Sequence, residues 1–414
     1  MLCFSFYVLA DTFFIARALG ANGLTGLNLS ISVFSVLQGL ALMIGVGGAT
    51  QYTILKSRNE TANSIFTYSL FIGLCVAIIF VIIGLLLTTS LAKMLGADKA
   101  TLPLTVTYMR TILYFSPALI LNTILILFVR NDNNPKLAMA GMVTGSFSNI
   151  VLDYIFLFPL SMGMFGAALA TGLSLILGII VLSLHFLRKS NQLNLCKCKI
   201  HIKKIINIFL SGFSAMIGEL SFAISLITFN LVILRIEGNI GVAAYGIVAN
   251  IALILISLFT GVAQGIQPLI SKGHGSGNNI LVKQTIKYAI ALVFLLAIAM
   301  YGLTYFYSTV IVTAFNSEVN ISLALLAQTG MKIYFIGLIF AGMNIVTASF
   351  FSAAGNSKKG IIISLLRSCV IIIPLVILLS TIFKMNGIWF SFVLTEFVVC
   401  VLSIVFLYKK LKNY

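Results

Sequence analysis

Twelve long apolar segments recur along this chain, and each is long enough to cross a lipid bilayer. A membrane-spanning helix needs about 20 mostly apolar residues. Only 8% of the 414 residues are charged and 60% are hydrophobic, whereas about a quarter of a typical globular domain is charged. The sequence therefore predicts an all-α integral membrane protein with twelve transmembrane helices. They lie near residues 1–17, 24–52, 64–90, 103–129, 137–160, 164–186, 205–232, 243–270, 285–314, 321–352, 361–383 and 386–408.

Membrane topology explains the formal net charge of +17. The basic residues occupy short loops between apolar segments, without the basic face that nucleic-acid binding needs. They gather on alternate loops, and the positive-inside rule places these loops and both termini in the cytoplasm. We expect a multi-pass protein of a plasma membrane with no nucleic-acid partner. The clusters are Lys56 with Arg58, Arg130 with Lys136, residues 188–204, residues 272–287, Lys358 with Lys359, and residues 409–412.

The second half of the chain repeats the first. The segment 24–52 aligns with 243–270 at an offset of about 220 residues, which pairs Gly26 with Gly246 and Gly45 with Gly265. Such duplication predicts two pseudo-symmetric six-helix bundles related by an axis along the membrane normal. We expect bundles over residues 1–187 and 205–414, joined by a basic cytoplasmic linker at 188–204. The first segment has only about ten residues before Asp11, so we expect either that the native start lies upstream or that the sequence is a fragment.

Polar groups in the first half concentrate at one depth. Gly141, Gly145, Asn149 and Asp153 are each four residues apart, so they share one face of a helix. At a rise of about 1.5 Å per residue, Asp11, Asp153 and Thr171 each lie roughly 10–15 Å from the outer ends of their helices, with Asn149 one turn deeper. The sequence therefore predicts that three helices deliver oxygen atoms to one site.

A carboxylate inside a membrane needs a partner, because it costs about 2.5–3.5 kcal/mol at the helix centre. Arg367 lies at a compatible depth to Glu396 on the neighbouring segment, which predicts a structural ion pair. For Asp11, an ion pair with Arg110 is the alternative to an ion site. Asp153 has no cation within its own helix, so we favour a site where the acids bind H⁺ or Na⁺.

The second half carries other polar positions. Glu219 lies near the middle of 205–232, on the same face as Asn230 three turns later. Gln264 and Gln267 stand beside Pro268, where they either line a cavity or accompany a packing kink. We predict that these four residues line a substrate cavity.

We predict neither a metal nor a cofactor besides the coupling ion. The pattern of Cys196, Cys198 and His201 does not match the usual zinc spacing. A reduced cytoplasmic loop explains these residues instead.

Several stretches carry a family resemblance over essentially the whole chain. They are "YVLADTFFIARALG", "NNPKLAMAG...SNIVLDYIF", "GMFGAALATGLS" and "AAYGIVANIALIL...GVAQGIQPLIS". They resemble the multidrug and toxic compound extrusion (MATE) transporters. The resemblance implies two lobes around a central cavity and export of cationic or amphipathic compounds in exchange for H⁺ or Na⁺. It also implies an ion site at Asp11, Asn149, Asp153 and Thr171, and a further acid at Glu219.

Two other functions remain as alternatives to a monomeric drug antiporter that takes small-molecule substrates in a lipid bilayer. A lipid-linked saccharide flippase of the same superfamily would need several cations in its cavity, yet only Arg110, Lys332 and Arg367 lie more than a few residues inside the spans. A membrane-embedded enzyme would need a paired His and acid or a nucleophile with its base. The spans contain neither motif.

Overall fold

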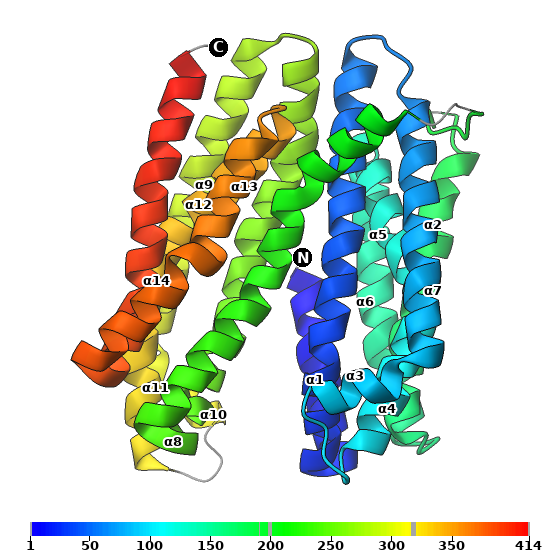
Figure 1. The fold of residues 1–414 in the computed structure, drawn as a ribbon. Coiled ribbons are helices and arrows are strands. Elements are labelled where there is room, and N and C mark those ends of the chain that lie inside the picture. Colours follow the sequence, from blue (N-terminus) through cyan, green and yellow to red (C-terminus); the bar gives the residue numbers. More distant parts are fainter. Residues whose placement is uncertain (1, 190, 198–200, 316–319, 413–414) are drawn as a thin grey trace. The chain divides into compact units, whose positions relative to one another are not determined.

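The computed structural model describes residues 2–189, 191–197, 201–315 and 320–412, and in these ranges every regular element is a helix. Figure 1 shows them in chain order. They are α1 (Leu2–Ser57), α2 (Asn63–Leu86), α3 (Thr88–Met94), α4 (Leu102–Tyr114), α5 (Ser116–Asn131), α6 (Pro135–Leu157), α7 (Gly163–Ser183), the 3₁₀ turn η1 (Leu184–Leu187), α8 (Ile202–Gly275), α9 (Asn279–Phe306), α10 (Ser308–Phe315), α11 (Ile321–Tyr334), α12 (Gly337–Ala353), α13 (Ser357–Leu365), the π-helical η2 (Leu366–Val370) and α14 (Ile372–Lys412).

Three of these helices are pairs of arms joined by a one-residue turn. The turns are at Gly20 (φ 65°) in α1, Gly238 (φ 62°) in α8 and Lys384 (φ 49°) in α14. A positive φ breaks a right-handed helix, and glycine adopts it without steric cost. Figure 1 shows the chain reversing direction within α1. The second arms, Asn22–Ser57 and Ile240–Gly275, start 218 residues apart, close to the predicted repeat offset.

The helices supply the predicted spans. By length and composition, eight helices of the described residues can cross a membrane, or ten if each of two bent pairs is one span. The bent pairs are α4 with α5 (51°) and α11 with α12 (50°). The turns at Gly20 and Lys384 set apart two further arms, residues 2–19 and 385–412. Each exceeds about 25 Å at 1.5 Å per residue, so the described chain contains twelve arms of membrane length.

The chain divides into two compact units, Leu2–Met216 and Ile217–Tyr414. The division lies inside α8, beyond the segment 188–204. The start of α8 packs closely on α1 through two glycines, because a methyl group on Gly47 would clash with the carbonyl of Ile208 and one on Gly212 with that of Met43. Gln51 Nε2 also donates to Ser211 Oγ over 2.8 Å.

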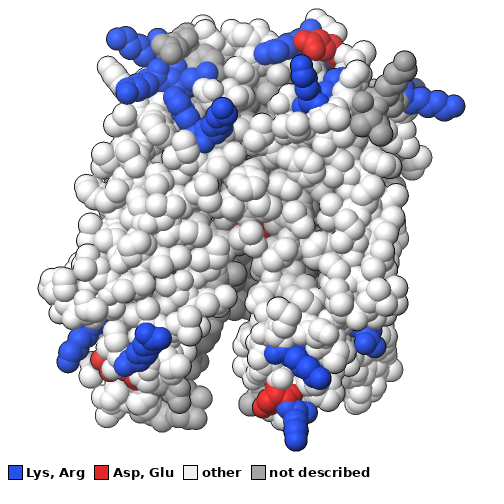
Figure 2. Space-filling model, viewed as in Figure 1, with Lys and Arg blue, Asp and Glu red and all other residues white. Residues whose placement is uncertain are grey.

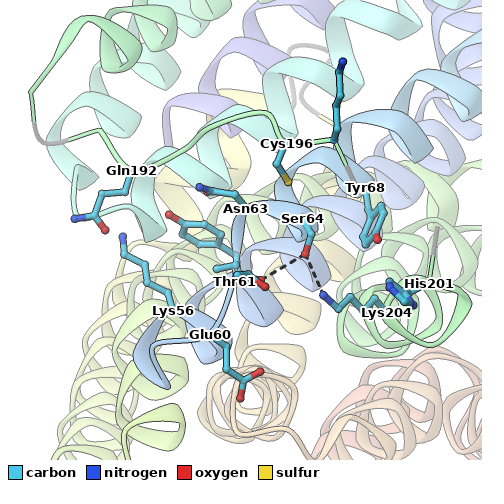
Figure 3. Close-up of a pocket in the computed structure, with 13 residues that line it drawn as sticks. Lys56, Glu60, Thr61, Asn63, Ser64, Tyr68, Gln192, Cys196, His201 and Lys204 are labelled. Atoms are coloured by element: carbon cyan, nitrogen blue, oxygen red, sulfur yellow. Dashed lines mark hydrogen bonds between the residues drawn. The ribbon is translucent and has the colours of Figure 1, made fainter. Parts of the chain in front are cut away.

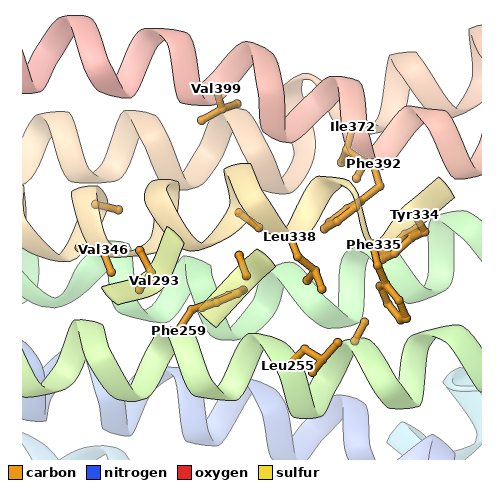
Figure 4. Close-up of a cluster of buried hydrophobic side chains, with 14 of the residues drawn as sticks. Leu255, Phe259, Val293, Tyr334, Phe335, Leu338, Val346, Ile372, Phe392 and Val399 are labelled. Carbon is orange, nitrogen blue, oxygen red and sulfur yellow. The ribbon is translucent and has the colours of Figure 1, made fainter. Parts of the chain in front are cut away.

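Each unit is built around apolar contacts with charge at its ends. In the second unit, buried side chains such as Phe259, Leu338 and Val399 form one core between α8, α9, α12 and α14 (Figure 4). Figure 2 shows that, on the face viewed, Lys and Arg lie at the two ends of each unit, with an almost uncharged band between. This distribution suits helices whose middles face lipid.

Candidate functional site

Buried polar groups from four helices meet in the first unit. Asp11 is on the first arm of α1, Asn149 and Asp153 are on α6, and Thr171 is on α7. Their exposed fractions are 6%, 1%, 0% and 4%. Asn149 Nδ2 donates to Thr171 Oγ1 over 3.3 Å. The fourth helix, α4, contributes Tyr108, whose hydroxyl donates to Asp11 Oδ2 at the long distance of 3.5 Å.

Tyr108 connects the two acids. Its hydroxyl interacts electrostatically with Asp11 and Asp153 and contacts the side chain of Thr171. Asp11 and Asp153 also interact with each other. The structure therefore brings together the four residues singled out in the sequence and adds Tyr108. The sequence signal for Tyr108 is weak, since a tyrosine in an apolar span is common.

Four acceptor oxygens of this cluster have no hydrogen-bond partner among the described residues. They are Asp11 Oδ1, Asn149 Oδ1, and Oδ1 and Oδ2 of Asp153. A buried acceptor without a donor costs about 1–3 kcal/mol, and an unpaired buried charge costs more. A proton on a carboxyl group or a cation held by several oxygens removes this cost. The donor set, two carboxylates with an amide and hydroxyl oxygens, fits H⁺ or Na⁺.

Asp11 contacts Tyr108 and not Arg110. Arg110 is exposed and lies two positions after Tyr108, so it points to a different side of α4. The three ion pairs of the described chain are Lys56–Asp132, His185–Asp132 and Arg367–Glu396. The Asp11–Arg110 ion pair considered from the sequence does not form.

Close packing of α6 and α7 holds the site together. A methyl group on Gly141 of α6 would meet the Leu182 side chain of α7 at 2.7 Å, and one on Gly178 of α7 would meet the Gly141 carbonyl at 3.4 Å. Small residues let membrane helices approach closely enough for polar groups to bond across the interface. The Gly-x-x-x-Gly-x-x-x-Asn-x-x-x-Asp stripe of α6 therefore faces α7 with its glycines and places Asn149 beside Thr171.

The buried polar network of the second unit has its hydrogen bonds satisfied. Arg367 Nη2 and Nε donate to Glu396 Oε1 over 2.6 and 3.1 Å. Asn344 Nδ2 donates to Glu396 Oε2 over 2.8 Å, and Ser403 Oγ donates to Asn344 Oδ1 over 2.9 Å. Arg367 lies in the π-helical turn η2. Such complete pairing indicates a structural role.

The four predicted cavity residues all lie on α8 in the second unit. Glu219, Asn230 and Gln264 are half-buried, and Gln267 is 2% exposed. No helix break accompanies the glutamines, because the helix continues through Pro268. Their role in substrate binding stays a prediction.

A second polar cluster, which the sequence reading missed, surrounds Asp132 just after α5. Its carboxylate accepts hydrogen bonds from Lys56 Nζ (2.5 Å), Tyr52 Oη (3.1 Å), His185 Nε2 (2.9 Å) and the Gln192 backbone (2.9 Å). Burial alone would raise the pKa of Asp132, but the hydrogen bonds from Lys56, Gln192 and His185 hold that pKa below its usual 3.8. The polar run "RNDNNP" at 130–135 was its only sequence signal.

No group of three or more potential metal ligands occurs in the part of the chain that the structure describes. Of the motif considered from the sequence, Cys196 and His201 are described and Cys198 lies outside the described residues.

Sequence comparison connects this architecture to a family of transporters. The MatE family profile matches residues 1–155 and 215–378, one match in each half of the repeat. The chain is 25% identical over 401 residues to the multidrug export protein MepA of Staphylococcus saprophyticus, covering 96% of this chain and 88% of that protein. It is also 25% identical over 394 residues to MepA of Staphylococcus aureus, covering 94% and 86%.

Solved structures share the fold. An outward-facing multidrug resistance MATE family transporter of the MOP superfamily superposes with a TM-score of 0.93 at 21% identity, covering 99% of this chain and 92% of the other. A MOP superfamily transporter from Pyrococcus furiosus, whose binding pocket is described as having reverse polarity, gives a TM-score of 0.92 at 21% identity with the same coverage. The twelve-helix, two-bundle prediction is confirmed by this likeness.

Proposed function

Because the chain belongs to the MatE family, we propose that it is a secondary transporter that exports cationic or amphipathic drugs in exchange for H⁺ or Na⁺. The MepA relatives, named as multidrug export proteins, support drug export over an enzymatic role. We place the protein in a bacterial plasma membrane with both termini in the cytoplasm, on the strength of these relatives and of its loop charges. We further propose that it acts as a monomer.

The coupling ion binds, in this proposal, at Asp11, Asn149, Asp153 and Thr171, with Tyr108 as a neighbour. One observation carries the assignment: four fully buried acceptor oxygens there have no donor among the described residues. An H⁺ on one carboxyl group, or a Na⁺ shared by several of these oxygens, would satisfy them. Either cation would also remove the repulsion between the two acids.

Ion binding would change the packing of the first arm of α1. Asp11 is the acid of that arm, and it faces Tyr108 of α4 and Asp153 of α6. Neutralising one acid lets the arm approach α6, and charging both pushes it away. In exchange transport, the movement of the arm on ion binding would lower the affinity of the protein for the drug. One charge moving down 100 mV supplies about 2.3 kcal/mol, enough for a gradient of more than tenfold.

The drug would bind near Glu219, Asn230, Gln264 and Gln267 of the second unit. Glu219 is half-buried, and its carboxylate would attract a cation more strongly there than in bulk water. The flippase alternative is less well supported, since the cations of the spans are engaged or turned outward. Arg367 is paired with Glu396, Lys332 is exposed over the Tyr305 ring, and Arg110 is exposed.

Transport in proteoliposomes tests the proposal. A fluorescent cation is loaded, and its export is measured under a proton gradient and under a sodium gradient imposed separately. Asp11→Asn and Asp153→Asn keep the shape but remove a charge, so each should reduce gradient-driven export to near background while drug binding in detergent persists. Asp98→Asn, in an exposed loop between α3 and α4, is the matched control. Export that neither gradient drives would refute the antiporter assignment.

A further inference from the structure

A basic cavity opens beside the first turns of α2 and α8, within the first unit (Figure 3). Its volume is about 650 Å³. The end of the second arm of α1, the linker after η1 and both helix starts form its walls. This end of the unit is the one that the positive-inside rule assigns to the cytoplasm. The charged lining residues are Lys56, Glu60, Lys197 and Lys204, and His201 lies beside them.

Two of the three lysines lack an acidic partner. Lys56 is 2.5 Å from Asp132, so its charge is matched. Lys204 Nζ donates to the neutral Ser64 Oγ over 3.1 Å. Lys197 is exposed and makes no ion pair with the described residues. Figure 3 shows that Lys204 reaches Ser64 on the first turn of α2, whereas the Glu60 side chain points away from Ser64.

The first turn of α2 adds partial positive charge to the cavity. Its N-cap residue is Ala62, which has no side chain to accept a hydrogen bond from the amides of that turn. The Ile65 amide donates to the Ala62 carbonyl over 2.9 Å, and the helix dipole with the earlier amides of the turn favours an anion at such a position. Lys204 is held at this turn through Ser64. The first turn of α2 and the ammonium group of Lys204 thus lie on the same part of the cavity wall.

The linker that closes the cavity is held in place by its own backbone. The amides of alternate residues, Gln192, Asn194 and Cys196, each donate to a side chain of the helical bundle. Because alternate residues of an extended segment face the same side, one edge of the linker is anchored along its length. The cavity is therefore formed before any ligand arrives. The acceptors are Asp132 Oδ2 (2.9 Å), Asn63 Oδ1 (3.4 Å) and Thr67 Oγ1 (3.2 Å).

We propose that this cavity binds a phosphate-bearing anion, with Lys197, Lys204 and the first-turn amides of α2 as its ligands. The rim favours the headgroup of an acidic phospholipid over a soluble phosphate. Leu195 and Ile202, which flank the lining residues Cys196 and His201, are 72% and 69% exposed. Apolar side chains beside basic groups at a bilayer boundary suit a lipid, and basic pockets between membrane helices bind anionic headgroups.

The bound anion would fasten the start of α8 to α2. Lys204 belongs to α8 and Ser64 to α2, and at present one neutral hydrogen bond connects them. A phosphate that accepts from Lys204 and from the α2 amides adds charge-assisted bonds across the same gap. This role is independent of the acid cluster of α1, α6 and α7.

Native mass spectrometry of the full-length protein tests the site. The protein is exchanged into micelles that contain equal amounts of phosphatidylglycerol and phosphatidylcholine, and the retained lipids are counted. We expect retention of phosphatidylglycerol, weakened about fivefold by Lys204→Gln and roughly 25-fold by Lys197→Gln with Lys204→Gln, given the surface contribution of each lysine. The matched control is Lys283→Gln with Lys287→Gln, two exposed lysines of α9. Lys197→Glu is a second test variant, because Lys197 makes no ion pair with the described residues that the substitution would break.

A second experiment, without lipid, distinguishes a lipid headgroup from a soluble phosphate as the ligand. Inorganic phosphate is titrated into lipid-free micelles, and the unfolding temperature is recorded at constant ionic strength. If inorganic phosphate stabilises the wild-type protein, the Lys197 and Lys204 variants abolish this effect, and phosphatidylglycerol is not selectively retained, the ligand is a soluble phosphate. Absence of both effects in the wild-type protein, or equal losses in the α9 control, would overturn the proposal.

Discussion

Removing either partner of the buried Arg367–Glu396 pair should strongly destabilise the second unit. The side chains are 12% and 3% exposed. Truncating one partner of a buried ion pair typically costs about 3–5 kcal/mol, because the other charge stays buried without compensation. We therefore expect Arg367→Ala and Glu396→Ala each to lower the free energy of unfolding by an amount in that range.

The contacts predict that the two costs differ. In Arg367→Ala, Glu396 Oε1 loses both of its donors, and only Oε2 keeps its bond from Asn344. The cost should therefore fall in the upper part of the range. In Glu396→Ala, Arg367 keeps its partial exposure, and Asn344 keeps its bonds to Ser403 and to the backbone carbonyl of residue 396. The cost should then fall in the lower part.

A double-mutant cycle measures the coupling. Unfolding of the purified protein by sodium dodecyl sulfate, followed by tryptophan fluorescence, reports on this unit because the single tryptophan, Trp389, is buried there. Arg367→Leu combined with Glu396→Leu should be closer in stability to the wild type than either single variant, since no charge remains. Single variants as stable as the wild type, or strictly additive losses, would refute the reasoning.

Three further predictions concern the acids and their neighbours. Tyr108→Phe removes the donor to Asp11, so the pH midpoint of transport should shift while folding is retained, as transport at varied pH will show. Glu219→Gln should weaken binding of cationic drugs more than of neutral ones in detergent equilibrium binding. The pKa of Asp132 is lowered in the folded protein, so the stability it adds is present above about pH 3.8 and is lost as pH falls through the folded pKa. Asp132→Asn should reduce the unfolding temperature at pH 7 and flatten that acid dependence.

The sequence predicts how deep a polar residue lies along its helix. It is less informative about the direction in which that residue faces around the helix axis. The common level of Asp11, Asp153 and Thr171, with Asn149 one turn deeper, follows from a fixed rise per residue. The partner of Asp11 does not, because Tyr108 and Arg110 lie at nearly the same depth on α4. Only the packing of α4 decides that Tyr108 faces inward and Arg110 outward.

The sequence by itself determined the membrane-spanning helices, their repeat and the family, because hydrophobic length and motif order are properties of the chain alone. Tertiary structure decided which polar groups meet. Asp132 shows this most clearly: its partners Tyr52, Lys56, His185 and Gln192 come from three separate segments. No spacing in the sequence encodes such a meeting, since it depends on how the helices pack and on a linker held by backbone amides.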